Sequence, residues 1–178
     1  MNDSRMTSRL TKEMRKVIET DSHNPRGSRK ISQGQLMSLN GFEFNNRSKL
    51  GSTFLAPFTP GIDRVQGKLK VDVDSFVPGT AVAAAKGATH CKLVVAGAEA
   101  DFDNSKYVVN STRTPEIMLD QQVEAAQSLT VNVTAGTKLP VFIVFGIQFL
   151  QLVNGIFYPL QNGQYDAMAI VLTDSTLV

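Results

Sequence analysis

The sequence has no tryptophan, one cysteine and two histidines among its 178 residues. A single cysteine excludes an internal disulfide framework. The two histidines, His23 and His90, are too few for the common zinc sites built from several histidine ligands. The scarcity of these residue types therefore argues against a disulfide-stabilised domain and against a zinc enzyme.

Long apolar segments and a secretion signal are also missing. No apolar run reaches the roughly 18 residues that a membrane-spanning helix needs, and the N-terminal residues lack the apolar region of a signal peptide. We therefore expect synthesis in the cytoplasm, without a signal peptide, and no membrane partner. The final location of the protein is left open.

Catalytic motifs are missing as well. The chain has no Walker loop, no glycine-rich dinucleotide turn and no HExxH motif. His90 and Cys91 are neighbours in a predicted strand, where successive side chains point to opposite faces, so they do not form a nucleophile–base pair. We expect Cys91 to be a small core residue. We predict no catalytic residue, no cofactor and no enzymatic activity.

An amphipathic helix is predicted over Asp3–Thr20, within an N-terminal region of residues 1–22. Its apolar residues recur at spacings of three and four, which places them in one stripe. The stripe consists of Met6, Leu10, Met14, Val17 and Ile18. Because a lone helix of this length is only marginally stable in water, we expect the stripe to pack against a second copy of the chain and assembly to depend on it.

The N-terminal part of the chain is basic. Residues 1–30 hold eight Lys or Arg against four Asp or Glu, net +4, whereas residues 31–178 hold ten against twelve, net −2. A basic arm is one way to bind nucleic acid, but four excess charges are few for that role, so nucleic acid is a weakly supported partner. The basic arm consists of Arg5, Arg9, Lys12, Arg15, Lys16, Arg26, Arg29 and Lys30.

The helix is followed by a predicted flexible linker, residues 23–35, which is rich in Gly, Pro, Ser and basic residues. Its length would let the helix reach a neighbouring copy. Residues 36–178 form the predicted β domain, and the 42% hydrophobic content of the chain is enough for a sizeable core. Predicted strands include Gly41–Asn45, Thr53–Pro57, Arg64–Val73, His90–Ala98, Lys106–Asn110 and Leu129–Thr134.

These short strands, separated by turn residues, favour an all-β fold over alternating helices and strands. We predict an antiparallel β-sandwich, with a jelly roll as one form, preceded by the single N-terminal helix.

The C-terminal segment, residues 139–173, organises the predicted sheet. Asn154-Gly155 and Asn162-Gly163 each lie between apolar runs, so each predicts a hairpin with a two-residue turn. The strand that begins at Val141 is apolar on both faces, which is typical of a central strand buried on both sides. It is longer than its hairpin partner and therefore needs another.

A change of apolar phase after Phe149 predicts a β-bulge near Phe149–Leu150. The bulge would bury Leu150 and Leu152 together with Ile147. The alternative is a single meander with a frayed end.

Three acidic residues at alternating positions, Glu99, Asp101 and Asp103, form the most site-like cluster. On one strand face they could bind Ca²⁺ through carboxylate oxygens. A solvated strand end that runs into an Asp-Asn-Ser turn explains the same residues. We favour that interpretation and predict no metal site.

Several stretches resemble a family of uncharacterised proteins encoded in Bacteroidetes genomes. They read RGSRKI, LNGFEFNNRSKLGSTFLAPFT, GIDRVQGKLKVDVDSFVP, GATHCKLVVAGAEADF, PVFIVFGIQF and NGIFYPLQNGQYDAMAIVL. The resemblance covers nearly the whole chain. It implies a bacterial or bacterium-associated origin, and no activity comes with it.

Together these features favour a non-enzymatic structural protein, a β-sandwich subunit that self-associates into a shell, tube or filament. The alternative is a ligand- or carbohydrate-binding module that uses the acidic loop or the loop-rich phenylalanines, although exposed sugar platforms favour Trp and Tyr. Those phenylalanines are Phe42, Phe44, Phe54, Phe58 and Phe76.

Overall fold

A computed structural model describes residues 3–175 and shows two antiparallel sheets with one helix on the outside. In chain order the elements are α1 (Met6–Glu19), η1 (Ile31–Gln33), η2 (Leu36–Leu39), α2 (Leu50–Thr53), β1 (Phe58–Asp63), β2 (Lys68–Val73), α3 (Pro78–Ala81), β3 (His90–Asp101), β4 (Lys106–Arg113), β5 (Ile117–Met118), β6 (Gln127–Asn132), β7 (Val141–Val153), β8 (Ile156–Pro159), η3 (Leu160–Gly163) and β9 (Ala167–Asp174), where η marks a 3₁₀ turn.

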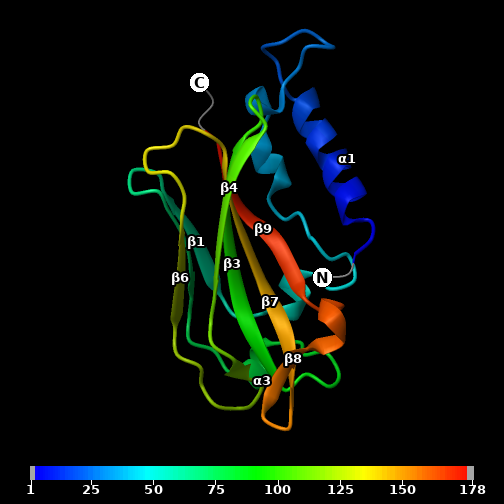
Figure 1. The fold of residues 1–178 in the computed structure, drawn as a ribbon, viewed down its shortest axis with the longest axis vertical. Helices are drawn as coiled ribbons and strands as arrows, with labels where there is room; N and C mark the ends of the chain where they lie inside the picture. The colour runs from blue at the N-terminus through cyan, green and yellow to red at the C-terminus, as the bar shows by residue number, and fades with distance from the viewer. Residues whose placement is uncertain (1–2, 176–178) are drawn as a thin grey trace.

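The larger sheet has the order β4-β3-β7-β8, with β5 beside β3 and β9 beside β7, and the smaller sheet has the order β1-β2-β6. Figure 1 shows the larger sheet between the smaller sheet on one side and α1 on the other. The predicted all-β sandwich with an N-terminal helix is thus confirmed. The strand predicted at Gly41–Asn45 is only an isolated bridge to β9.

Strand β7 is the centre of the larger sheet. Its side chains are buried on both faces from Val141 to Leu150, apart from the half-buried Val144 and Gln148. It pairs with β3 on one edge and with both β8 and β9 on the other. The second partner that its length required is therefore β9.

The Asn154-Gly155 turn between β7 and β8 is as predicted. Both residues have positive φ, 51° and 80°, as a type I′ turn requires, and Val153 pairs directly with Ile156.

The second predicted hairpin, at Asn162-Gly163, is wrong. Strands β8 and β9 lie on the same edge of β7, so they are two parts of one returning strand rather than neighbours. Between them η3 loops outward through three consecutive residues with positive φ, Gln161 (44°), Asn162 (53°) and Gly163 (75°). Pro159 is the last residue of β8, and its nitrogen, which carries no N–H, faces away from β7.

The predicted bulge near Phe149–Leu150 is also wrong. The β3–β7 pairing is continuous from Glu99–Val141 to His90–Leu150. The irregularity lies in β9, where Val171 is the extra residue opposite Ile143 and Val144. Leu150 is buried, but Leu152 is 39% exposed. The sequence phase changes because β7 extends beyond its covering layers, and no residue is inserted into it.

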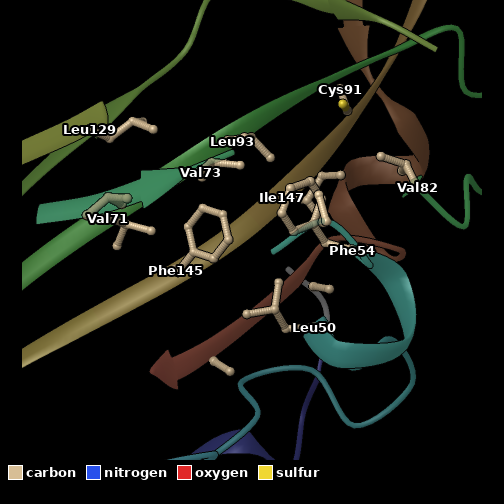
Figure 2. Packing of buried hydrophobic residues seen from close by; sticks show 14 of the residues in the cluster. Leu50, Phe54, Val71, Val73, Val82, Cys91, Leu93, Leu129, Phe145 and Ile147 are labelled. Carbon is tan, nitrogen blue, oxygen red and sulfur yellow. The ribbon is translucent and has the colours of Figure 1, made fainter. Parts of the chain in front are cut away.

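The main core lies between the two sheets. Val71 and Val73 of β2 lie beside Phe145 and Ile147 of β7 (Figure 2), and Leu69 of β2 belongs to the same cluster. The sheets approach each other closely at Gly97 of β3. A Cβ atom there would lie 2.6 Å from Val131 Cγ2 and 2.7 Å from Leu69 Cδ1.

A second core joins α1 to the outer face of the same sheet. Val17 is fully buried, with Leu36 and Leu39 of η2 beside it and Phe142 and Ile170 of the sheet beneath. Leu10 and Met14 of the stripe are partly buried against this cluster, and Met6 and Ile18 are half-buried. The helix therefore packs on its own domain, whereas the sequence predicts that it packs against a second copy.

The predicted linker is a defined loop folded around Asp21. The carboxylate accepts hydrogen bonds from the backbone N of His23 (2.8 Å), Asn24 (3.1 Å) and Lys30 (2.8 Å), and from Asn24 Nδ2 (2.9 Å). Burial acts to raise the pKa of Asp21, but these bonds prevail and hold the pKa well below its usual range. This arrangement keeps α1 close to the sheet.

Replacement of Gly34 tests the docking of α1. A Cβ atom at Gly34 would lie 2.2 Å from the backbone oxygen of Val17, a clash that no side-chain rotation relieves. Gly34→Ala should lower the free energy of unfolding by about 1–3 kcal/mol in chemical denaturation. Gly51→Ala is the matched control, because nothing lies within 4 Å of its added Cβ. Equal stabilities of the two variants would contradict the docking.

The pH dependence of stability tests Asp21. Because the pKa is lowered in the folded protein, the stabilisation by Asp21 is present above the unfolded-state pKa of about 3.9 and lost as pH falls below it. Asp21→Asn should thus be less stable than the parent at pH 7, and the difference should shrink in denaturation curves below about pH 4. A difference that stays constant with pH would exclude this role.

Candidate self-association surface

The β7–β8 hairpin carries an unusual set of exposed apolar side chains, which we call the apolar hairpin. Its members and their exposed fractions are Leu152 (39%), Val153 (42%), Ile156 (56%), Phe157 (37%) and Tyr158 (50%). At roughly 200 Å² for a fully exposed large side chain, these fractions amount to roughly 450 Å² of accessible surface. Leu152 and Phe157 lie on one face of the hairpin, and Val153, Ile156 and Tyr158 lie on the other. Exposed apolar surface of several hundred Å² on a soluble monomer often marks an interaction site.

The hairpin has a fixed shape. Besides its type I′ turn, the Leu152 backbone N–H donates to Thr89 Oγ1 at 2.8 Å. The Phe157 ring meets the His90 ring edge-on, with 4.8 Å between the ring centres. The hairpin projects from one end of the larger sheet (bottom of Figure 1). Its apolar residues are therefore held in place before any partner binds.

A second exposed apolar stretch lies on β4, an edge strand of the same sheet. Every residue of β4 is exposed except the half-buried Thr112. Tyr107 is 77% exposed, Val108 42% and Val109 56%. Proteins normally protect edge strands with charges, bulges or a covering segment. In β4 the charges, Lys106 and Arg113, stand only at the two ends.

The β9 edge, in contrast, is covered. Residues 41–45 run beside it, and Gly41 N donates to Ile170 O (2.7 Å), Ile170 N to Phe42 O (2.9 Å) and Phe44 N to Met168 O (2.8 Å). Within residues 3–175, the two main edges of the larger sheet that remain uncovered are thus β4 and the shorter β8.

The three acidic residues predicted as the most site-like cluster do not converge. Glu99 is buried and accepts hydrogen bonds from Thr134 N (3.0 Å) and Thr137 Oγ1 (2.8 Å). Burial acts to raise the pKa of Glu99, but these bonds outweigh it and lower the pKa.

Asp101 and Asp103 also have their own partners. Asp101 is bonded to Asn104, and Asp103 lies 3.6 Å from Lys30 Nζ. In the described part of the chain, no three His, Cys, Asp or Glu residues are placed to hold a metal ion.

Cys91 lies in the main core, and burial raises the pKa of its thiol to about 12. The thiol is therefore protonated at neutral pH and gives no nucleophile. His90 faces the opposite side of the sheet, toward Phe157.

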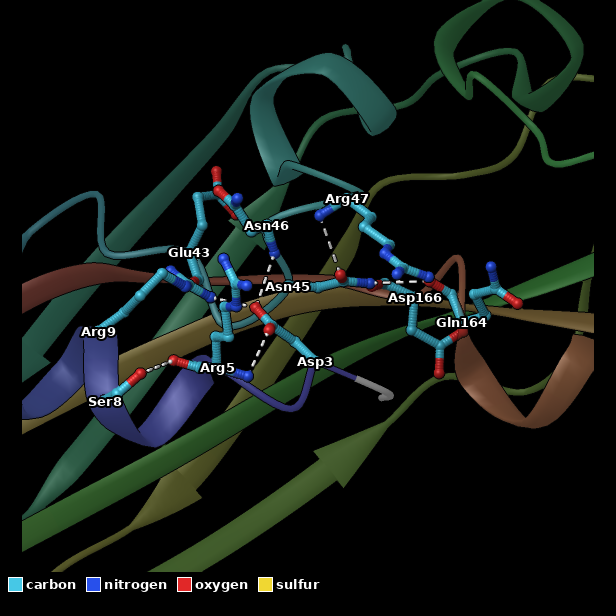
Figure 3. Close-up of polar contacts among 10 residues, drawn as sticks. All are labelled: Asp3, Arg5, Ser8, Arg9, Glu43, Asn45, Asn46, Arg47, Gln164 and Asp166. Atoms are coloured by element: carbon cyan, nitrogen blue, oxygen red, sulfur yellow. Dashed lines mark hydrogen bonds and ion pairs between the residues drawn. The ribbon is translucent and has the colours of Figure 1, made fainter.

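The basic arm is folded back onto the domain. Arg9 pairs with Asp3 and donates to the Glu43 carbonyl oxygen at 2.7 Å (Figure 3). Its guanidinium carbon also lies over the Phe42 ring, 5.1 Å from the ring centre. Lys16 pairs with Glu13, Lys30 with Asp103, and Arg29 donates to the Glu19 carbonyl oxygen. Half of the eight arm residues are thus engaged within the chain, which weakens the argument for nucleic acid.

A cavity of about 410 Å³ lies between α1 and residues 38–49. Arg9, Lys12 and Lys49 line it together with Glu13 and Glu43. Burial raises the pKa of Glu43, although its carboxylate accepts hydrogen bonds from Leu50 N.

The phenylalanines offered as a sugar platform are core residues. Phe54, Phe76 and Phe42 are buried, and Phe44 and Phe58 are half-buried. The Phe54 ring lies edge-on to the rings of Phe76 and Phe145. None of the five belongs to the exposed class of side chains that a sugar platform needs.

The sequence predicts the hairpin and most of β4 as strands, but it does not predict that their side chains are exposed. The run of Tyr107, Val108 and Val109 is apolar on both faces in a strand flanked by charges, but this pattern does not show whether a layer covers the strand.

Comparison with protein-family models, with curated proteins and with solved structures gives no match to this chain. The resemblance to the Bacteroidetes family therefore stays a prediction. Among the described residues, no helix has the length and apolar character needed to span a membrane.

Calcium tests the acidic cluster. We expect the thermal midpoint of the parent to be the same with Ca²⁺ and with a chelator, because Glu99 and Asp101 already bind protein donors. The double variant Asp101→Asn, Asp103→Asn is the control and should be equally insensitive to Ca²⁺ in a thermal-shift measurement. A Ca²⁺-dependent rise in the parent that the variant abolishes would prove a calcium site.

Proposed function

We propose that the protein is a non-enzymatic structural subunit that associates with further copies of itself through the apolar hairpin. The observation that carries the proposal is the exposure of five large apolar side chains on a rigid hairpin at one end of the sheet. A ligand pocket would enclose such side chains, whereas here they project outward.

The size of the hairpin sets what it can do. Burying roughly 450 Å² of apolar surface at about 25 cal/mol per Å² gives on the order of 11 kcal/mol. Association itself costs roughly 4–15 kcal/mol. The hairpin alone therefore supports only weak association, and a stable assembly needs a matching apolar surface on the partner.

Helix α1 acts indirectly in this proposal. Its stripe is used within the chain, so removing residues 1–30 would expose Phe142 and Ile170 and destabilise the sheet. Such a truncation is a poor test of association, because loss of assembly and loss of folding would coincide.

The alternative function is a ligand-binding module. The observation that favours it is the charged cavity between α1 and residues 38–49. The guanidinium of Arg9 is already bonded to Asp3 and Glu43 there, which reduces the groups left for a ligand. A protein that binds ligands through this cavity has no need to associate.

Charging the hairpin tests the proposal. Val153 and Ile156 form its terminal cross-strand pair and are both exposed, so the double variant Val153→Lys, Ile156→Lys should keep its fold. We expect the parent to show a concentration-dependent mass above 19.4 kDa in light scattering, and the variant to stay monomeric with a similar thermal midpoint.

Val65→Lys is the matched control. Val65 is 84% exposed in the turn between β1 and β2, so this variant makes an apolar-to-lysine change on another surface. It should associate like the parent. A parent that is monomeric at high concentration would refute the structural role and favour the ligand-binding module.

A further inference from the structure

The free edge of β4 has a defined set of outward backbone groups. Thr114 N donates to Leu93 O at 3.0 Å, which fixes the alternation of the antiparallel ladder between β3 and β4. Even-numbered residues of β4 therefore bond to β3, and the odd-numbered Tyr107, Val109 and Ser111 direct N–H and C=O away from it. These outward groups have no hydrogen-bond partner within residues 3–175.

Strand β8 has a shorter set of outward backbone groups. Leu152 N points toward the β3 side, where it meets Thr89, so the odd-numbered residues of β7 bond to β8. Their partners are Ile156 and Tyr158. Phe157 therefore directs its N–H and C=O outward, and Pro159 offers an outward C=O. Neither residue has a backbone partner on this side in the described chain.

We propose that β8 of one copy pairs antiparallel with β4 of the next copy, which continues the larger sheet from subunit to subunit. The inference rests on the proposed self-association and names the surface that receives the hairpin. β4 and β8 lie at opposite edges of one sheet and run in opposite directions, because each of the three intervening strand pairs is antiparallel. An antiparallel junction therefore joins copies that have the same orientation.

The faces of the strands fix the register of the junction. Val109 pairs with Ala98, and Ala98 lies under α1, while Phe157 pairs with Leu152 on the same face of the sheet. Setting Phe157 opposite Val109 aligns both the faces and the outward hydrogen-bonding groups.

The same register brings the remaining apolar side chains together. It places Tyr158 opposite Val108 and Pro159 opposite Tyr107. Moving the pairing by two residues, with Phe157 opposite Tyr107, would place Tyr158 opposite Lys106 instead. The first register thus places three of the four β8 residues opposite apolar residues, with Ile156 opposite Asn110, and keeps Tyr158 away from Lys106.

The area of the two surfaces agrees with a stable contact. The exposed fractions of Tyr107, Val108 and Val109 amount to roughly 350 Å², and the apolar hairpin adds roughly 450 Å². Specific interfaces bury about 1,200–2,000 Å² in total. The two apolar patches would supply about half of that, and flanking polar residues such as Asn110 and Ser111 lie where they add to it.

The junction does not close on itself. Phe157 pairs with Leu152, which lies two residues beyond the His90–Leu150 pair along β7. Val109 pairs with Ala98, which lies eight residues from the same pair along β3, in the other direction. The next copy is therefore displaced by ten residues, about 33 Å along the strands. A head-to-tail contact between copies of one orientation, with this displacement, builds an open filament or tube rather than a two-fold dimer.

Mixing two defective variants tests the junction. Val109→Pro removes an N–H that faces away from β3, so the strand should stay paired within its own sheet. We expect Val109→Pro alone, and the hairpin variant Val153→Lys, Ile156→Lys alone, to be monomeric. An equimolar mixture should form a 1:1 dimer of twice 19.4 kDa and nothing larger, because one intact hairpin and one intact β4 edge remain.

The other outcomes distinguish failure of the β8–β4 junction from failure of the proposed structural role. If Val109→Pro assembles like the parent, the hairpin binds another surface, and this inference is overturned while the structural role stands. A mixture that stays monomeric also overturns it. A parent that stays monomeric refutes both. Should Val109→Pro lower the thermal midpoint, Val109→Lys takes its place, because it keeps the backbone donor and removes the apolar contact.

Discussion

Burial of β7 on both faces is the constraint on which the rest of the structure depends. Its inner side chains, such as Phe145 and Ile147, need the smaller sheet, and its outer ones, such as Phe142, need α1 and η2. Strands β3 and β9 then flank it on both edges. The three layers seen in Figure 1 bury both faces of this one apolar strand.

The same constraint explains why the hairpin is exposed. β7 continues past the end of both covering layers, so its last residues keep an apolar composition without a layer to bury them. Gln151 and Val153 have no smaller sheet opposite them. The exposure is thus built into the length of β7, and a neighbouring copy is the surface that we infer replaces the missing layer.

The sequence predicted what depends on local geometry. Asn154-Gly155 forms its turn because positive φ at both residues is a local demand, and α1 forms because its stripe repeats within a few residues. Asn162-Gly163 has the same composition, but β9 pairs with β7 rather than with β8. That pairing depends on β7, which lies outside the turn, so the turn sequence alone could not predict it.

The candidate site was beyond reach of the sequence for a related reason. Alternation tells which face of a strand a residue occupies, but not what covers that face. The stripe of α1 belongs to one buried cluster with Phe142 and Ile170, more than 120 residues later in the chain, so this part of its intramolecular environment had no local signal. Tyr107 and Val109 would have the same pattern under a covering layer as they have on the open edge.

The interruption between β8 and β9 has one more consequence. There the backbone N–H of Phe149 meets no strand and donates instead to Asp166 Oδ1 at 3.0 Å, while Asn45 Nδ2 binds the carbonyl oxygens of Gln164 and Asp166. A side chain thus takes one place in the ladder. The loop of residues 160–166 can open without breaking the β7–β9 pairs, so its amide hydrogens should exchange with solvent before those of the core strands.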